Sequence, residues 1–142
     1  MKKIAILFAI LLMLFLTSFY HSDQIKKEIP VLCYHNIRAI KPNATEAIKA
    51  YTVTPKAFAE QMKALSDNGF KTISPDQLYN YLINDKPLPS KPILITFDDT
   101  REEHYNLAAT EMNKYGFKGV FFIMTVAINR PGYMRSEEHT SE

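Results

Sequence analysis

The sequence is poor in the residues that build disulfide-rich or phosphate-binding domains. Its 142 residues include one cysteine, four glycines and no tryptophan. One cysteine excludes a disulfide within the chain, and no glycine-rich phosphate loop is present. Neither sign of charge dominates, because 17 lysines and arginines and 15 acidic residues leave a net charge of +2. This balance predicts no nucleic-acid partner, and the length predicts one domain.

An apolar segment at the N-terminus stands apart from the rest of the chain. Lys2 and Lys3 precede an unbroken apolar run from Ile4 to Leu16, and polar residues follow it. This is the layout of an export signal, and the apolar segment also reaches the lower length limit of a membrane helix. Residues 1–22 are therefore predicted to form a hydrophobic helix, either a cleaved signal peptide or an uncleaved membrane anchor. Both alternatives predict an extracytoplasmic domain (secreted, periplasmic or anchored) that meets the membrane only through this segment.

Strand and helix signals alternate along the remaining chain. Thr54-Pro55 and Ser74-Pro75 each combine a capping residue with a proline at the first helical position, and a third helical pattern runs from Tyr105 to Tyr115. The predicted strands are Ile29–Tyr34, Phe70–Ile73, Ile93–Phe97 and Val120–Thr125. This alternation predicts an α/β domain with a parallel sheet or a β/α barrel. Cys33, inside the first apolar run, is expected to be a small buried hydrophobic residue.

Two adjacent carboxylates, Asp98 and Asp99, directly follow the third predicted strand. In folds of this class the reactive groups lie at the carboxyl ends of strands, and His35 follows the first strand in the same way. Adjacent side chains leaving a strand point in different directions, so the two carboxylates can have different roles. The residues alone allow three interpretations. They are a metal and proton-transfer site, a magnesium-dependent phosphoryl-transfer site, and a simple cap on the helix that starts near Arg101.

Several stretches, taken in order, are similar to the polysaccharide deacetylase family of the NodB-homology type. They are VLCYHNI (Val31–Ile37), YTVTPKAFAEQMKALSDNGFKTIS (Tyr51–Ser74), LPSKPILITFDDT (Leu88–Thr100), MNKYGFKGVFFIMT (Met112–Thr125) and, more weakly, PGYM (Pro131–Met134). The resemblance implies that residues 29–134 are the N-terminal part of a carbohydrate esterase family 4-like domain. The implied fold is a partial (β/α) barrel of the polysaccharide deacetylase type.

The resemblance also implies a reaction and roles for individual residues. The reaction is the metal-dependent hydrolysis of N-acetyl groups on a polysaccharide of the N-acetylglucosamine type. Asp98 would be the general base and Asp99 a ligand of a divalent metal, most often zinc. Thr100 stands where the family motif continues with glycine, which predicts a variant turn. His35 is expected either to line the sugar pocket or to be a structural histidine, and His104 is expected to be exposed on the first turn of a helix.

The metal site that the resemblance implies is incomplete in this sequence. The family's later H-[ST]-x-x-H motif does not occur. Because a catalytic zinc usually has three protein ligands, we expect this chain alone to be inactive. The alternatives to a truncated hydrolase are a non-catalytic carbohydrate-binding relic and a magnesium-dependent phosphoryl-transfer domain. The predicted export and the missing phosphate loop disfavour the phosphoryl-transfer domain.

The final stretch, RSEEHTSE (Arg135–Glu142), breaks the pattern abruptly after PGYM. It is similar to the peptide obtained by translating a common sequencing-library adapter in one reading frame. We therefore expect residues 135–142 to be an adapter-derived artefact that has no functional role.

Overall fold

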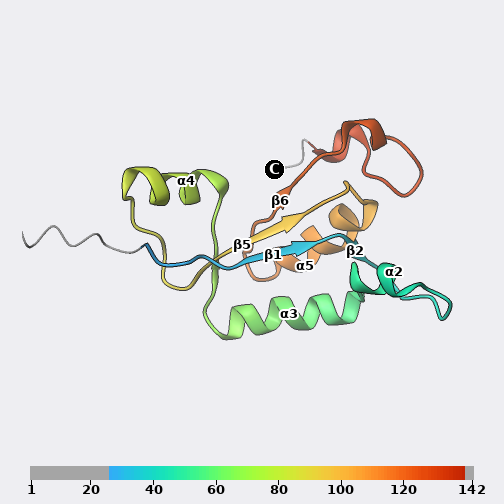
Figure 1. The fold of residues 1–142 in the computed structure, drawn as a ribbon, viewed down its shortest axis with the longest axis horizontal. Coiled ribbons are helices and arrows are strands. Elements are labelled where there is room, and N and C mark those ends of the chain that lie inside the picture. The colour runs from blue at the N-terminus through green and yellow to red at the C-terminus, as the bar shows by residue number, and fades with distance from the viewer. Residues whose placement is uncertain (1–25, 140–142) are drawn as a thin grey trace, which may run out of the picture.

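The computed structural model describes residues 26–139 (Figure 1). The strands are β1 (Val31–Tyr34), β2 (Asn36–Ile37), β3 (Thr52–Val53), β4 (Lys71–Thr72), β5 (Pro92–Phe97) and β6 (Val120–Phe121). The helices are α2 (Glu46–Ala50), α3 (Pro55–Asp67), α4 (Pro75–Asn84), the π-helix η1 (His104–Ala109), α5 (Thr110–Asn113) and the 3-10 helices η2 (Thr125–Ala127) and η3 (Ser136–His139). The predicted signal or anchor at residues 1–22 lies outside the described residues. Within residues 26–139, no helix is long and apolar enough to cross a membrane.

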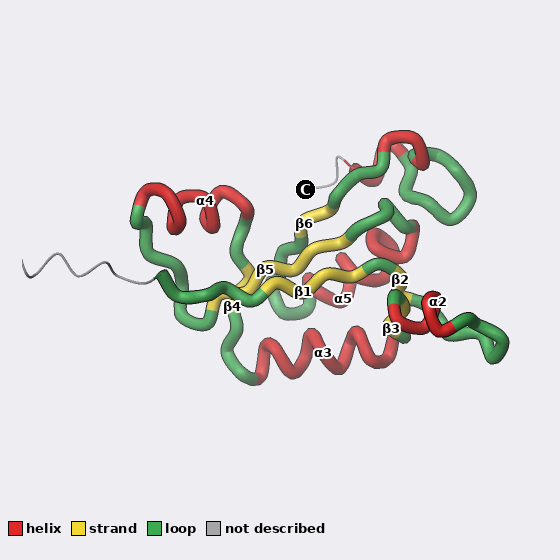
Figure 2. Tube along the Cα trace, viewed as in Figure 1, coloured by secondary structure: helices red, strands yellow, loops and turns green. Residues whose placement is uncertain are grey.

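The main sheet is parallel and has β5 at its centre. β1 pairs with one edge of β5, while β4 and β6 pair with the other edge near its start and its end. Successive residues of β5 bond to opposite neighbours. The Leu94 amide donates to the Pro30 carbonyl on the β1 side, and the Ile93 carbonyl accepts from the Ile73 amide on the β4 side. The four predicted strands are therefore neighbours in one parallel sheet, as the sequence indicated. Figure 2 shows the sheet with α3 running along one side of it.

The two predicted capping motifs start α3 and α4. The Thr54 hydroxyl accepts a hydrogen bond from the Ala57 amide at 3.2 Å, with proline at the first helical position. Ser74 forms a full capping box with Gln77, because each side chain accepts from the other residue's backbone amide. These contacts satisfy amide groups that have no partner inside the helix.

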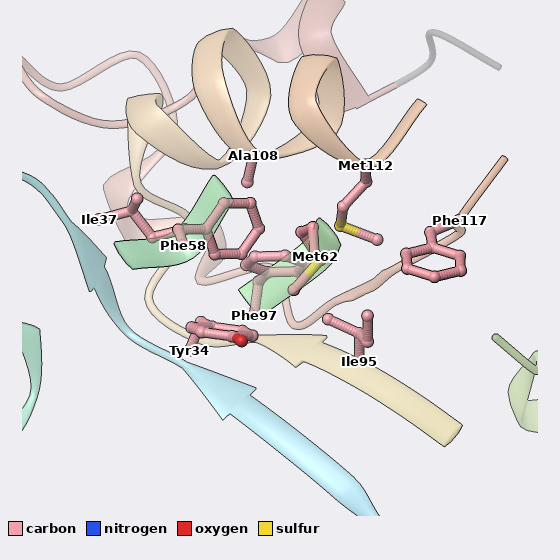
Figure 3. Packing of buried hydrophobic residues seen from close by; sticks show 9 residues of the cluster. All are labelled: Tyr34, Ile37, Phe58, Met62, Ile95, Phe97, Ala108, Met112 and Phe117. Carbon is pink, nitrogen blue, oxygen red and sulfur yellow. The ribbon is translucent and has the colours of Figure 1, made fainter. Parts of the chain in front are cut away.

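One apolar core joins the sheet to α3, η1 and α5 (Figure 3). Side chains alternate along a strand, so Ile95 and Phe97 of β5 and Tyr34 of β1 turn toward the helices, where they meet Phe58 and Met62 of α3. The Tyr34 ring lies 5.0 Å from the Phe58 ring in an edge-to-face arrangement. The same burial raises the pKa of the Tyr34 hydroxyl to about 12. This core fixes β1 beside β5, and so it fixes where their carboxyl ends lie.

Three features of the fold differ from the sequence-based expectation. The strand predicted at Val120–Thr125 ends at Phe121, and the side chain of Phe122 is exposed rather than covered. Cys33 is exposed rather than buried, because Tyr34 takes the helix-facing position and alternation turns Cys33 to the opposite face. The sequence also missed the small parallel sheet of β2 and β3, which holds the loop after β1.

Candidate functional site

The carboxyl ends of β1 and β5 meet at one rim of the sheet and bring His35 beside the two aspartates. Tyr34 and Phe97 are register partners at the ends of these strands. The Asp98 amide then donates to the Tyr34 carbonyl at 2.9 Å, so the pairing continues one step past β5. His35 and Asp98 therefore leave the two strands at the same level. The structure gathers the three residues singled out from the sequence, while their chemical roles stay predictions.

Asp99 sits on a strained turn and carries two cationic or polar neighbours. Its φ is 72°, in the left-handed region that few residues other than glycine adopt. One carboxylate oxygen lies 3.5 Å from His35 Nδ1 and 3.9 Å from Arg101 Nη2. The Asp99 side chain is 40% exposed, so a ligand can still reach it. The Asp99 carboxylate therefore lies close to a histidine and an arginine and stays accessible to solvent.

Thr100 lies on the predicted variant turn, and its hydroxyl holds the turn in place. Its φ is 53° and its side chain is almost fully buried, at 2% exposed. A left-handed conformation costs about 1–2 kcal/mol for a residue with a Cβ. Against this cost, Thr100 Oγ1 accepts from the Met124 amide and donates to the Phe122 carbonyl at 3.4 Å, and the Thr100 carbonyl accepts from the Met134 amide at 3.0 Å. The predicted variant turn is therefore tied to the segment that follows β6.

His104 is buried under the rim, which corrects the expectation that it would be exposed. It is 0% exposed and begins the π-helix η1. Its Nδ1 accepts from the Arg101 amide at 3.2 Å, so Nε2 carries the proton and donates to the His35 carbonyl at 2.6 Å. Burial is the main cause that lowers the pKa of His104, although the bond to His35 opposes it. The neutral imidazole of His104 therefore holds the backbone of His35 in position.

Sequence reasoning missed His104 and Arg101 as parts of the rim. The Arg101 guanidinium lies over the Tyr133 ring at 4.6 Å, and the two residues also share a β-bridge. The apolar spacing of the third helix predicted an α-helical turn near residue 104, but residues His104–Ala109 are π-helical. A π-turn rotates the helix faces relative to a 3.6-residue period, and no sequence pattern indicated it. The contact of Arg101 with Tyr133 joins segments 32 positions apart in the sequence, beyond the reach of local patterns.

The described residues offer one group of side chains with metal-binding atoms at this rim. Cys33, His35 and Asp98 each offer one ligand atom, and these atoms all lie within 4.8 Å of one another. Asp99, the ligand that the resemblance implies, belongs to no such group of three among residues 26–139 and has the Arg101 cation nearby. The described residues therefore do not complete a three-ligand metal site on Asp99.

Comparisons with known proteins point to one family. The family model for polysaccharide deacetylase matches residues 85–141, which include β5 and both aspartates. Over 122 residues the chain is 30% identical to a Bacillus subtilis (strain 168) protein with the name "Putative polysaccharide deacetylase YxkH". By sequence, this chain is similar to the polysaccharide deacetylase family over most of its length. The alignment covers 86% of the chain and 41% of the Bacillus subtilis protein.

Solved structures of polysaccharide deacetylases share the fold. The Streptococcus pyogenes deacetylase PplD in complex with acetate superimposes with a TM-score of 0.70 at 26% identity, covering 80% of this chain and 51% of that one. BC0361, a polysaccharide deacetylase from Bacillus cereus, has a TM-score of 0.64 at 28% identity, with 79% and 34% covered. IcaB from Ammonifex degensii has a TM-score of 0.61 at 27% identity, with 75% and 43% covered. The chain thus spans about half the length of these relatives or less.

Proposed function

We propose that this chain is part of a metal-dependent hydrolase that removes N-acetyl groups from a polysaccharide of the N-acetylglucosamine type. The observation that carries the proposal is the placement of Asp98 and Asp99 directly after β5, beside His35, at the carboxyl ends of a parallel sheet. The similarity to polysaccharide deacetylases supports the reaction class, and the relative PplD was solved with acetate, which is the product that such a reaction releases. We also propose that this chain forms part of a (β/α) barrel of the polysaccharide deacetylase type.

In this proposal Asp98 takes a proton from the attacking water. Its backbone is fixed by the hydrogen bond to Tyr34, and its side chain stands on the open face of the sheet, where a sugar can approach. His35 and Arg101 border Asp99 and orient its carboxylate. A divalent metal, zinc in most of the family's chemistry, would polarise the acetamide carbonyl. Because the described residues supply only Asp99 toward that metal, the proposal assigns no step to it.

The proposal predicts that the 142-residue chain releases no acetate, and that the protein extended with the natural sequence after Met134 does. The assay measures acetate released from N-acetylglucosamine oligomers in the presence of zinc. In the extended protein Asp98→Asn should lower kcat by about 10²–10⁴-fold, because a general base contributes a factor of that size. The matched control is Asp76→Asn, which changes an exposed aspartate on α4.

Three outcomes would contradict this proposal. Turnover by the 142-residue chain that Asp98→Asn abolishes would show that these residues already form a complete site. Turnover by the extended protein that survives Asp98→Asn would remove the assigned base. A folded extended protein that binds the oligomers without releasing acetate would favour the carbohydrate-binding relic.

A further inference from the structure

The helix α4 turns its apolar side chains outward. No residue of α4 is buried, and Tyr79, Leu82 and Ile83 are 60%, 47% and 62% exposed. Their spacing of three and four residues places them on one face of the helix, while Asn80 and Asn84 lie on the opposite side. A surface helix normally turns such an apolar stripe toward the core. The face formed by Tyr79, Leu82 and Ile83, called the α4 apolar face below, is left uncovered by residues 26–139.

The first described residues of the chain are held against this helix. Lys26 Nζ donates to the Leu82 carbonyl and forms an ion pair with Asp85 at 3.0 Å. The Tyr81 hydroxyl donates to the Lys27 carbonyl at 3.3 Å. In Figure 1, α4 and the start of the coloured chain lie at the same end of the molecule. The point at which the chain leaves residues 1–25 is therefore fixed beside α4.

The hydrophobic segment predicted to enter a membrane ends close to this point in the sequence. Its unbroken apolar run ends at Leu16, and Lys26 follows ten residues later. A fully extended chain covers at most about 3.6 Å per residue, so these ten residues span at most about 36 Å. If residues 1–22 stay in the membrane as an anchor, covalent geometry therefore keeps α4 near the lipid surface.

Charges around α4 are balanced, so they neither attract nor repel an anionic surface strongly. The charged residues on α4 and on the adjoining segments 26–28 and 85–86 are three lysines and three acids: Lys26, Lys27, Lys86, Glu28, Asp76 and Asp85. Interfacial binding increases with the buried apolar area and with attraction to anionic lipids. Only the apolar contribution is available here, so contact with lipid should depend little on lipid charge or on salt.

We propose that the α4 apolar face inserts into the interfacial layer of the membrane that holds residues 1–22 as an uncleaved anchor. Aliphatic side chains enter the boundary between headgroups and acyl chains, and tyrosine is enriched at the headgroup level. Leu82 and Ile83 supply the first kind of contact and Tyr79 the second. The inference rests on the anchor alternative for residues 1–22 and does not require the protein to be a deacetylase.

Docking through α4 also sets the direction in which the rim of the sheet faces. Figure 1 shows that the arrows of β1 and β5 point away from the end where α4 lies. The six residues of β5 extend about 20 Å at about 3.3 Å per residue. The rim that carries His35 and Asp98 therefore faces away from the membrane, toward material outside it.

The experiment uses single tryptophans as reporters, because the sequence contains no tryptophan. Tyr79→Trp reports on the α4 apolar face. Tyr51→Trp is the matched control, since Tyr51 is 59% exposed and its ring lies 5.0 Å from that of His35, at the other end of the sheet. Each 142-residue variant is reconstituted into phosphatidylcholine vesicles, with lipids brominated on the acyl chains as quenchers. We expect the emission of Tyr79→Trp to shift to shorter wavelength and to be quenched by these lipids, with or without added salt. Tyr51→Trp should show neither change.

A second variant tests whether the apolar side chains cause the contact. Leu82→Gln and Ile83→Gln, combined in the Tyr79→Trp chain, remove the aliphatic part of the face and should abolish most of the quenching. Both positions are exposed, and glutamine is a good helix former, so the fold should not change. Circular dichroism checks the folding of each variant. Flotation with the vesicles shows separately whether residues 1–22 anchor the chain.

Five results would overturn the proposal. A chain that does not float with the vesicles would remove the anchor on which it rests. In an anchored chain, quenching of Tyr79→Trp by aqueous iodide instead of by lipid would show that α4 faces water. A shift to shorter wavelength without lipid quenching would show that protein covers the face. The partner is a second copy if the shift depends on the ratio of protein to lipid, and it is the natural sequence after Met134 if only the extended protein shows the shift. Quenching that survives the double glutamine change, or that salt abolishes, would exclude apolar insertion. None of these readouts uses turnover, so a failed deacetylase assay leaves the docking proposal standing.

Discussion

The two faces of the parallel sheet differ in how completely other segments of the chain cover them. On the helix side, Phe58, Phe97 and Met112 are at most 2% exposed, and aromatic rings pack in contact with one another. On the other face the edge strand β1 is open, since Val31 is 52% exposed and Cys33 is exposed, while Leu94 and Thr96 of the central strand β5 are buried. Side chains alternate between the two faces along each strand. The difference in exposure therefore depends on which segments cover each face.

The comparison shows where stability and chemistry separate in this chain. The helix face gains its stability from apolar burial, which needs only side chains of the right size and shape. The rim at the end of the open face instead holds two left-handed residues, Asp99 and Thr100, and a buried imidazole, His104. Strained and buried polar residues cost free energy and cluster at functional sites. We therefore expect changes on the helix face to affect folding most, and changes at the rim to affect the geometry of the site.

The largest effect should come from removing the central ring of the core. Phe97→Ala should lower the free energy of unfolding by about 3–5 kcal/mol, because it deletes buried surface and leaves a cavity. Phe97 contacts rings on three sides, from Tyr34, Phe58 and Phe121. Denaturant unfolding followed by circular dichroism measures the change.

The matched control for the core is a phenylalanine on the open side. Phe122 is 59% exposed, so Phe122→Ala should change the free energy of unfolding by at most about 0.5 kcal/mol. Equal losses in Phe97→Ala and Phe122→Ala would break the comparison, because they would show that another surface covers Phe122.

An intermediate effect is expected at Thr100. Thr100→Val keeps the branched shape but removes the hydroxyl that bonds to Met124 and Phe122. Losing these two hydrogen bonds should lower the free energy of unfolding by about 1–3 kcal/mol, because each one contributes about 0.5–1.5 kcal/mol. Thr100→Ser retains the hydroxyl and should stay close to the unaltered chain. If Val and Ser variants are equally stable, the hydroxyl does not hold the turn.

The sequence predicted the parts of this molecule that depend on local patterns. Caps at Thr54 and Ser74 and apolar runs at β1 and β5 depend on neighbouring residues, and parallel connectivity then places Asp98 and His35 at one rim. The exposure of Cys33, the early end of β6 and the burial of His104 depend instead on contacts between distant segments. His104, for example, is held by the carbonyl of His35, 69 residues away. Such contacts leave no local signature, and this is why the predicted site lacked its supporting residues.

The smallest and most specific effect concerns pH. Burial lowers the pKa of His104 in the folded chain below the value of about 6.5 expected in the unfolded chain. Below pH 6.5 the unfolded chain therefore binds a proton that the folded chain excludes, so the stability contributed by neutral His104 is present above this pH and is lost as the pH falls. Other groups act on the same imidazole, because Glu103 and Asp99 favour its charged form and Arg101 opposes it.

The measurement is the denaturant midpoint of the unaltered chain and of His104→Gln between pH 7.5 and pH 5.5. The unaltered chain should lose more stability over this range than His104→Gln, while His35→Gln, which keeps the His104 imidazole, should retain the His104-linked loss. The same pH dependence in His104→Gln and in the unaltered chain would mean that His104 is not held as a buried neutral group in the folded chain.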